Sequence, residues 1–191
     1  MKIMKPKAVH EINGVIVGEN VQRAVKLYRD AKYFYRHIDG TLDDDTVMYE
    51  VYHYTQEDDS HPGHLSWGLT ILYPVTVSDE CNMTRGHFHH DTECAEFYYG
   101  IAGKGLLLLM DKEGTTWSEE VFPGSLHDIK GVFAHRLINI GTQPLKVAAC
   151  WPTKAGHNYE QVERKPFGYR VYQGTTGLEI KQEREEKDND K

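Results

Sequence analysis

Turn signals that contain glycine or proline divide the chain after Thr46 into short apolar, β-branched segments, and this spacing constrains the fold more than any other feature. Such signals stand at residues 103–105, 112–114, 123–124 and 141–144. The segments between and around them predict strands at 47–55, 65–75, 96–102, 106–111, 115–122, 136–140, 145–151 and 168–173. Many short strands with this punctuation favour an antiparallel sandwich or barrel.

The two ends of the chain differ from this β-rich centre. Near the N-terminus, Val21, Val25 and Tyr28 recur at helical spacing behind Asn20, a good N-cap, so we expect a short helix at 20–31. At the other end, residues 181–191 are nearly all polar or charged, and we expect a loose tail there. A chain of 191 residues with these ends indicates one domain at 1–180, with its core at about 47–160.

Composition argues against several classes of protein. The formal net charge of −7 argues against nonspecific nucleic-acid binding, which needs a basic surface. No apolar run is long enough to span a membrane, and the first residues lack the apolar core of a signal peptide, so we expect a cytoplasmic protein. The three cysteines form no CxxC pair, which fits a reducing compartment and argues against a cysteine-based zinc site.

A histidine cluster near the middle of the chain carries the strongest chemical signal. On a strand, His87 and His89 point to the same face, and two imidazoles so placed form a natural chelating pair. After a turn, Glu96 opens the returning strand and can face this pair, and His135 heads a later strand. The sequence therefore predicts an interior metal site of three imidazoles and one carboxylate, and a row of histidines without metal is the alternative.

Two glutamates compete for the carboxylate position. Glu93 is closer to the histidine pair but lies where the chain must turn, so its side chain should be exposed, whereas Glu96 shares an inward face with Tyr98. We therefore prefer Glu96. We interpret His90 as exposed or as a supporting residue, and His10, His37, His53, His61, His64 and His127 as surface or packing residues. We interpret Phe97, Tyr99, Phe133 and Trp151 as core or dimer-interface aromatics.

The cluster resembles the two motifs of the cupin superfamily. The first motif is similar to His87-x-His89 followed by a glutamate, six residues and Gly103, and the second is similar to Gly131, His135 and Asn139. The sequence departs from the superfamily pattern in two places. Ile129 stands where a proline is usual, and the gap from His89 to Glu96 is longer than the usual spacing, which Glu93 would satisfy.

Further motifs in order narrow the resemblance to the cupin-type glucose-6-phosphate isomerases, best known from archaea. They lie between about residues 49 and 159: Tyr49-Glu50-Val51-Tyr52, Thr70-Ile71-Leu72-Tyr73-Pro74, Thr84-x-Gly86-His87-Phe88-His89, Ala95-Glu96-x-Tyr98, Ala134-His135-Arg136 with Asn139-Ile140-Gly141, and Ala155-Gly156-His157-Asn158-Tyr159. In that family the long gap between histidine and glutamate is itself the pattern, which favours Glu96. Arg85 is a departure, because family members often carry lysine there, but the positive charge is kept.

The resemblance implies a fold, a cofactor and a partner. The implied fold is an all-β cupin, a double-stranded β-helix with a jelly-roll-like barrel, which here would carry a short N-terminal helix and extra flanking strands. The implied cofactor is one divalent metal ion per subunit on His87, His89, Glu96 and His135, with Fe²⁺ favoured and Zn²⁺, Mn²⁺ or Ni²⁺ as alternatives. Cupins commonly pair through an exposed sheet edge, so we expect a homodimer.

The resemblance also implies a reaction, the interconversion of glucose 6-phosphate and fructose 6-phosphate in glycolysis and gluconeogenesis. The metal would be a Lewis acid and Glu96 the base of a cis-enediol route, with a hydride shift as the rival route. The implied phosphate lining is Tyr49, Thr70, Thr84 and Gly86, and the implied sugar contacts are Tyr98, His157 and Tyr159, of which the last two are also catalytic candidates. Because strict alternation would turn Thr84 and Gly86 away from His87, a bend near Gly86 is expected.

Three other functions compete with this one. A cupin dioxygenase could use the same three histidines and carboxylate to hold iron. A related sugar-phosphate isomerase, for example one acting on mannose 6-phosphate, would need only a different hydroxyl orientation in its substrate. A ligand-binding cupin without catalysis is the third, but nothing in the chain resembles an attached DNA-binding segment.

Overall fold

The computed structural model describes residues 1–11, 14–55, 61 and 63–183, and most of its regular structure is β. The strands are β1 (Ala8–His10), β2 (Ile16–Gly18), β3 (Val21–Leu27), β4 (Val47–Tyr54), β5 (Leu65–Leu72), β6 (Thr76–Val77), β7 (Glu80–Cys81), β8 (Glu96–Ala102), β9 (Gly105–Met110), β10 (Thr116–Val121), β11 (Leu126–Ile129), β12 (Ala134–Asn139), β13 (Leu145–Pro152), β14 (Tyr169–Gly174) and β15 (Gly177–Gln182). The helices are α1 (Tyr28–Ala31) and α2 (Glu160–Arg164), and short 3-10 turns lie at Lys32–Phe34 and Thr153–Ala155.

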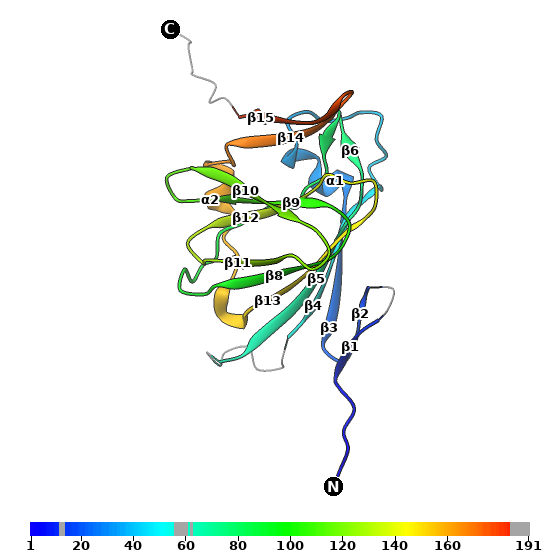
Figure 1. Ribbon diagram of the computed structural model, residues 1–191, viewed down its shortest axis with the longest axis vertical. Coiled ribbons are helices and arrows are strands. Elements are labelled where there is room, and N and C mark those ends of the chain that lie inside the picture. Colours follow the sequence, from blue (N-terminus) through cyan, green and yellow to red (C-terminus); the bar gives the residue numbers. More distant parts are fainter. Residues whose placement is uncertain (12–13, 56–60, 62, 184–191) are drawn as a thin grey trace.

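Two antiparallel sheets enclose the core (Figure 1). The larger has six strands in the order β11-β8-β13-β5-β4-β3, and the smaller has the order β10-β9-β12. One apolar cluster joins them, because Met48 and Leu72 of the larger sheet pack with Leu107 and Leu137 of the smaller one. This arrangement confirms the prediction of an all-β fold of the cupin type.

The smaller sheet is covered on both faces, which explains the continuous apolar run of β9. Its alternate residues Leu107 and Leu109 face the interior together with β12. Leu106 and Leu108 point the other way, where they line a small cavity with Val171 of β14 and Ile180 of β15. A strand buried on both faces has no polar side, so it reads as an uninterrupted hydrophobic segment.

The predicted helix at 20–31 is wrong over most of its length. Residues 21–27 form β3, which pairs along β4 from Val21 opposite Tyr54 to Leu27 opposite Val47, and only Tyr28–Ala31 is helical. Asn20 lies in a turn with φ +60° and caps no helix. Val21 and Val25 are four residues apart, a spacing that fits a strand face as well as a helix face. Backbone pairing with β4 and the β-branched side chains of the valines favour the strand over the helix.

The predicted strands after Thr46 are confirmed, with ends that differ by at most three residues. The sequence did not indicate β1, β2, β6, β7, β11 and β15, all short or peripheral. The loose tail was expected from residue 181, but β15 continues to Gln182, and Glu183 is bonded to two arginines. Residues 184–191 lie outside the described part of the chain.

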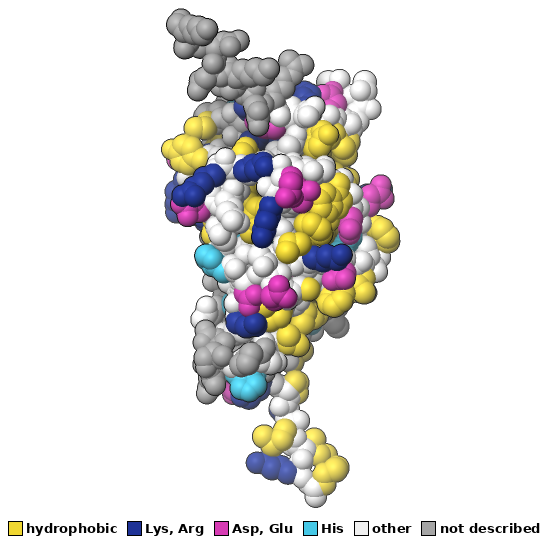
Figure 2. All heavy atoms as spheres, turned by 90° about the vertical axis from the view of Figure 1, so that its left-hand side faces the viewer, with side chains coloured by type: hydrophobic (Ala, Val, Ile, Leu, Met, Phe, Trp, Pro, Cys, Tyr) yellow, Lys and Arg dark blue, Asp and Glu magenta, His cyan; other side chains and the backbone are white. Residues whose placement is uncertain are grey.

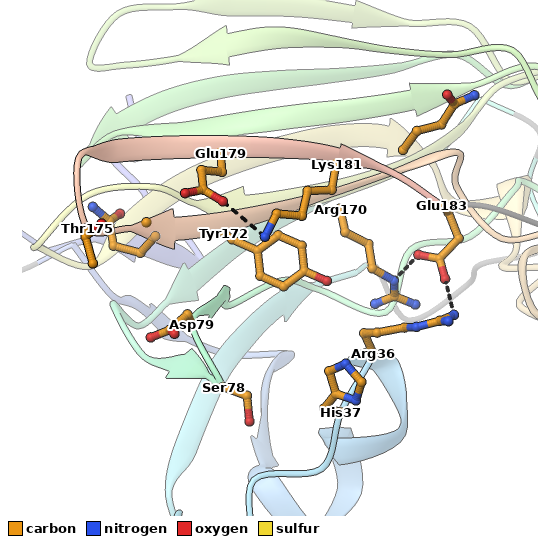
Figure 3. A pocket seen from close by; sticks show the side chains of 13 residues that line it. Arg36, His37, Ser78, Asp79, Arg170, Tyr172, Thr175, Glu179, Lys181 and Glu183 are labelled. Atoms are coloured by element: carbon orange, nitrogen blue, oxygen red, sulfur yellow. Dashed lines mark hydrogen bonds and ion pairs between the residues drawn. The ribbon is translucent and has the colours of Figure 1, made fainter.

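A buried ionic cluster attaches the C-terminal hairpin β14–β15 to the N-terminal segment. The carboxylate of Glu80, almost fully buried, accepts hydrogen bonds from the Arg36 backbone N–H and the Arg170 guanidinium, each at 2.7 Å. Arg170 also donates to the Phe34 carbonyl and forms an ion pair with Glu183. Figure 3 shows Arg36 and Arg170 converging on Glu183 beside a cavity of about 980 Å³.

The surface is mixed in charge where Figure 2 shows it, with acidic and basic side chains interspersed among hydrophobic ones. Within the described residues, the helices are too short to cross a membrane.

Candidate functional site

The histidine pair lies on an irregular segment that runs beside β12. The backbone N–H of Thr84 donates to the Leu137 carbonyl, and His87 and His135 exchange backbone hydrogen bonds of 3.2 and 3.0 Å. Gly86 has φ +77°, a conformation that disfavours residues with a Cβ, and it breaks the alternation of side chains. Thr84, Gly86 and His87 therefore line the same cavity, and the predicted bend at Gly86 is confirmed.

Three imidazoles and one carboxylate meet inside the fold. His87, His89, Glu96 and His135 each offer one ligand atom, and these four atoms lie within 4.8 Å of one another. Nε2 of His89 is 3.2 Å and Nε2 of His135 is 3.1 Å from Oε2 of Glu96. The structure thus brings together the four predicted metal ligands. Glu93 is exposed in the turn, as expected, so Glu96 is the carboxylate that reaches the histidines.

The backbone fixes the orientation of two of these imidazoles. Nδ1 of His89 donates to the Cys94 carbonyl at 2.7 Å, and Nδ1 of His135 donates to the Phe133 carbonyl at 3.4 Å. In the neutral rings the proton is then on Nδ1, so each Nε2 directs a lone pair toward the Glu96 carboxylate. A lone pair that faces a carboxylate is repelled by it unless a proton or a metal cation lies between them. Backbone acceptors on the outer nitrogens are typical of histidines that bind metal.

Two buried imidazole nitrogens of this cluster without a hydrogen-bond partner show how well a metal ion would fit. Nε2 of His87 and Nε2 of His135 are buried and have no hydrogen-bond partner, although the latter lies close to Glu96. A buried polar atom without a partner costs about 1–3 kcal/mol. A divalent cation would satisfy both nitrogens together with the carboxylate. The donor set therefore fits a metal such as Fe²⁺, Mn²⁺, Ni²⁺ or Zn²⁺.

The electrostatics of the cluster point the same way. Burial alone would raise the pKa of Glu96, but the adjacent His135 and His89 imidazoles lower it below its ordinary value. Burial opposes a charge on His89 too, yet Glu96 and the Cys94 carbonyl raise the pKa of that ring. Burial and the neighbouring imidazoles hold the pKa of His87 well below its usual range. The site thus favours an ionised carboxylate and attracts positive charge.

A cavity of about 190 Å³ adjoins the cluster and reaches the surface. Among its lining residues are all seven that the sequence predicted for substrate: Tyr49, Thr70, Thr84, Gly86, Tyr98, His157 and Tyr159. They come from β4, β5, β8 and the segments at 83–88 and 156–159. Residues more than 100 positions apart in the chain therefore share one cavity with Glu96, His87 and His135.

The segment after β13 covers the mouth of this cavity. A backbone bridge between Phe88 and Asn158 holds it, and the exposed His157 ring lies 4.3 Å from the His87 ring, centre to centre. The Tyr159 ring lies 5.6 Å from the His87 ring. The Arg85 guanidinium lies over the Tyr159 ring, with its central carbon 4.3 Å from the ring centre, and it forms an ion pair with Glu163 of α2. Arg85 thus lines the cavity and also contacts the segment after β13 that covers it.

Two cavity residues were missed in the sequence. His53 was interpreted there as a surface or packing residue and Trp151 as a core or dimer-interface aromatic, but they stack on each other in the cavity wall, with ring centres 5.2 Å apart. A signal for His53 was available, because alternation along β4 from Tyr49 through Val51 places it on the same face. His127 is a packing residue as expected, buried against Ser125 and Glu119.

Comparison with known proteins agrees with the site. Over residues 20–190 the chain matches the sequence model of the family glucose-6-phosphate isomerase (GPI). It is 37% identical over 157 residues to the glucose-6-phosphate isomerase of Thermococcus kodakarensis, covering 81% of each chain. The enzyme of the same name from Thermococcus litoralis is 34% identical over 187 residues, with 95% of this chain and 96% of the relative covered.

Some solved structures resemble the chain at low sequence identity. Oxalate decarboxylase from Bacillus subtilis at pH 4.6 is 18% identical, with a TM-score of 0.46 over 57% of this chain and 26% of that chain. The family match covers nearly the whole chain, and the relatives are matched over most of their length. The chain belongs to the glucose-6-phosphate isomerase family.

Proposed function

We propose that this protein is a metal-dependent aldose–ketose isomerase that interconverts glucose 6-phosphate and fructose 6-phosphate. The observation that carries the proposal is the cluster of His87, His89, Glu96 and His135 beside the cavity, which all of these residues except His89 line. That cavity also holds hydroxyl donors and an ionised carboxylate, the groups that binding a sugar phosphate and moving a proton require. The family and the named relatives support the same substrate pair.

The four clustered side chains would hold one divalent metal ion. A bound divalent ion supplies Lewis acidity, which stabilises negative charge on the carbonyl and hydroxyl oxygens of the reacting carbons by several kcal/mol. Fe²⁺ is our first choice, and Mn²⁺, Ni²⁺ and Zn²⁺ suit the same three imidazoles and one carboxylate.

Tyr49, Thr70, Thr84 and Gly86 are proposed to bind the phosphate. Val51 of β4 pairs with Thr70 of β5, so Tyr49 and Thr70 are diagonal neighbours on adjacent strands, offset by two residues. Burial raises the pKa of Tyr49 to about 12, so its hydroxyl stays protonated and donates a hydrogen bond. Gly86 has no side chain, so a phosphate can approach its backbone closely. Arg85, beside them, contributes positive charge.

Glu96 is proposed to carry the proton between C1 and C2. Its lowered pKa keeps it ionised at neutral pH, and it lines the cavity in which those carbons would lie. A carboxylate so placed can accept the proton from one carbon and return it to the other through a cis-enediol. Tyr98 shares the inward face of β8 with Glu96 and is proposed to bind a sugar hydroxyl.

His157 and Tyr159 are proposed to contact the sugar from the covering segment. Although His157 is exposed at the mouth of the cavity, the surrounding protein partly desolvates its ring and lowers its pKa, which favours the neutral imidazole. A neutral imidazole can accept a proton at one nitrogen and donate from the other, as opening of a sugar ring requires. Tyr159 lies over the same cavity beside Arg85 and closes it toward α2.

The test is an assay of fructose 6-phosphate conversion coupled to glucose-6-phosphate oxidation. We expect the protein to lose activity on dialysis against a chelator and to regain it with a divalent metal. His135→Ala should abolish turnover and metal binding, while circular dichroism shows an intact β fold. Unchanged hexose phosphates with metal-loaded wild-type protein would refute the proposal. Faster turnover of mannose 6-phosphate than of glucose 6-phosphate would identify mannose 6-phosphate, the epimer, as the preferred aldose substrate.

A further inference from the structure

We propose that His53 determines specificity by binding a sugar hydroxyl through its Nε2, at the end of the cavity away from Tyr49. The Trp151 ring holds it there. This inference rests on the proposed function and extends it, because His53 lies outside the metal cluster and outside the residues assigned above.

The position of His53 follows from the strand register. Tyr49 and His53 lie on the same face of β4 and are four residues apart, which corresponds to about 13 Å along a strand. His53 pairs with Gly68, Gly68 pairs with Ala149, and Ala149 pairs with Tyr98, so His53 lies in the row of Tyr98. A phosphate bound near Tyr49 would thus place the sugar, rather than the phosphate, opposite His53.

Trp151 fixes the imidazole from one side. The two rings are stacked, with centres 5.2 Å apart and planes inclined by 26°. The indole lies across Gly68, where an added Cβ would come within 2.8 Å of both Cζ3 and Cη2. Only glycine leaves room for the ring at this place in β5. Gly68 and Trp151 therefore together position His53.

The Nε2 atom of His53 is buried and has no hydrogen-bond partner. Among the described residues, the other imidazole nitrogens in this state belong to His87 and His135 of the metal cluster. Burial lowers the pKa of His53, so the ring is neutral and carries both a donor and an acceptor. A neutral imidazole suits a hydroxyl group, whereas a phosphate calls for cationic or multiple N–H donors.

The experiment compares His53→Leu, His53→Gln and the control His61→Leu, which removes an exposed histidine outside the cavity. We measure kcat and KM for fructose 6-phosphate, inhibition by inorganic phosphate, and metal content. His53→Leu should lower kcat/KM roughly 10- to 100-fold, with metal content and the inhibition constant of inorganic phosphate unchanged. His53→Gln should recover part of the loss, because its amide can bond to the hydroxyl. The His61→Leu protein should match wild type.

Gly68→Ala tests the positioning by Trp151. The added methyl group should displace the indole and raise KM, as His53→Leu does. The double variant Gly68→Ala with His53→Leu should have nearly the same KM as His53→Leu alone, because both changes remove the same contact. A kcat/KM of His53→Leu within twofold of wild type would overturn the inference, and so would a phosphate inhibition constant that weakens as much as KM. If metal-loaded wild-type protein converts no hexose phosphate, the proposed function fails and this inference fails with it.

Discussion

Replacing Arg170 by methionine is expected to lower the free energy of unfolding by about 3–5 kcal/mol, because it leaves the Glu80 carboxylate charged and buried. The Glu80 side chain is 1% exposed, and the Arg36 backbone N–H would be its one remaining donor among the bonds described above. For a chain of this length, 1 kcal/mol changes Tm by about 2–4 °C. The expected decrease in Tm is therefore roughly 6–20 °C.

Urea denaturation and calorimetry of wild-type and variant protein measure this effect. The matched control is Arg164→Met, which removes an ion pair between side chains that are 75% and 69% exposed and should cost less than about 0.5 kcal/mol. The double variant Glu80→Gln with Arg170→Met removes both charges and should recover part of the loss. An Arg170→Met protein within about 1 kcal/mol of wild type would refute the view that this cluster attaches the C-terminal hairpin.

Three further changes test the site and the sheets. Glu96→Gln should reduce both metal content and turnover, whereas Glu93→Gln, in the exposed turn, should change neither; equal losses would reverse the choice of carboxylate. Gly86→Ala should cost roughly 1–2 kcal/mol in unfolding free energy because of its φ of +77° and a Cβ 2.9 Å from the Phe167 ring; a neutral melting curve would contradict this. The hydrogen bond from Arg23 lowers the pKa of Glu50 below its ordinary 4.5. The ionised Glu50 therefore stabilises the fold fully above pH 4.5, and this contribution disappears as the pH falls through the lowered pKa. Unfolding free energies should accordingly show Glu50→Gln less stable than wild type at pH 6, with a smaller difference at pH 3.

Local patterns were sufficient to predict the β fold and the cluster of three histidines and one glutamate that could hold a metal ion. The turn residues and the β-branched segments are local signals, so the strands from β4 to β14 could be located, except the short β6, β7 and β11. Alternation on β8 selected Glu96 over Glu93, and the structure places Glu96 beside His89 and His135. The conflict between alternation and the implied roles of Thr84 and Gly86 correctly indicated a bend.

Tertiary context decided what the sequence could not. Residues 21–27 join the free edge of β4, a pairing that no local spacing reveals, and the helical spacing of Val21 and Val25 was misleading. The stacking of His53 on Trp151 depends on Gly68 of β5, a strand that neighbours the strand of Trp151 in the sheet but lies more than 80 residues away from it in the chain. The homodimer stays a prediction; Phe97 and Tyr99, considered as interface aromatics, are exposed on β8.

Titration of metal-free protein with a divalent metal, followed by fructose 6-phosphate turnover, tests the central claim most directly. If His87, His89, Glu96 and His135 form one binding site that the reaction requires, activity should rise linearly from zero and level off at one equivalent of metal per chain. Full activity in protein shown by elemental analysis to contain no metal would contradict the account.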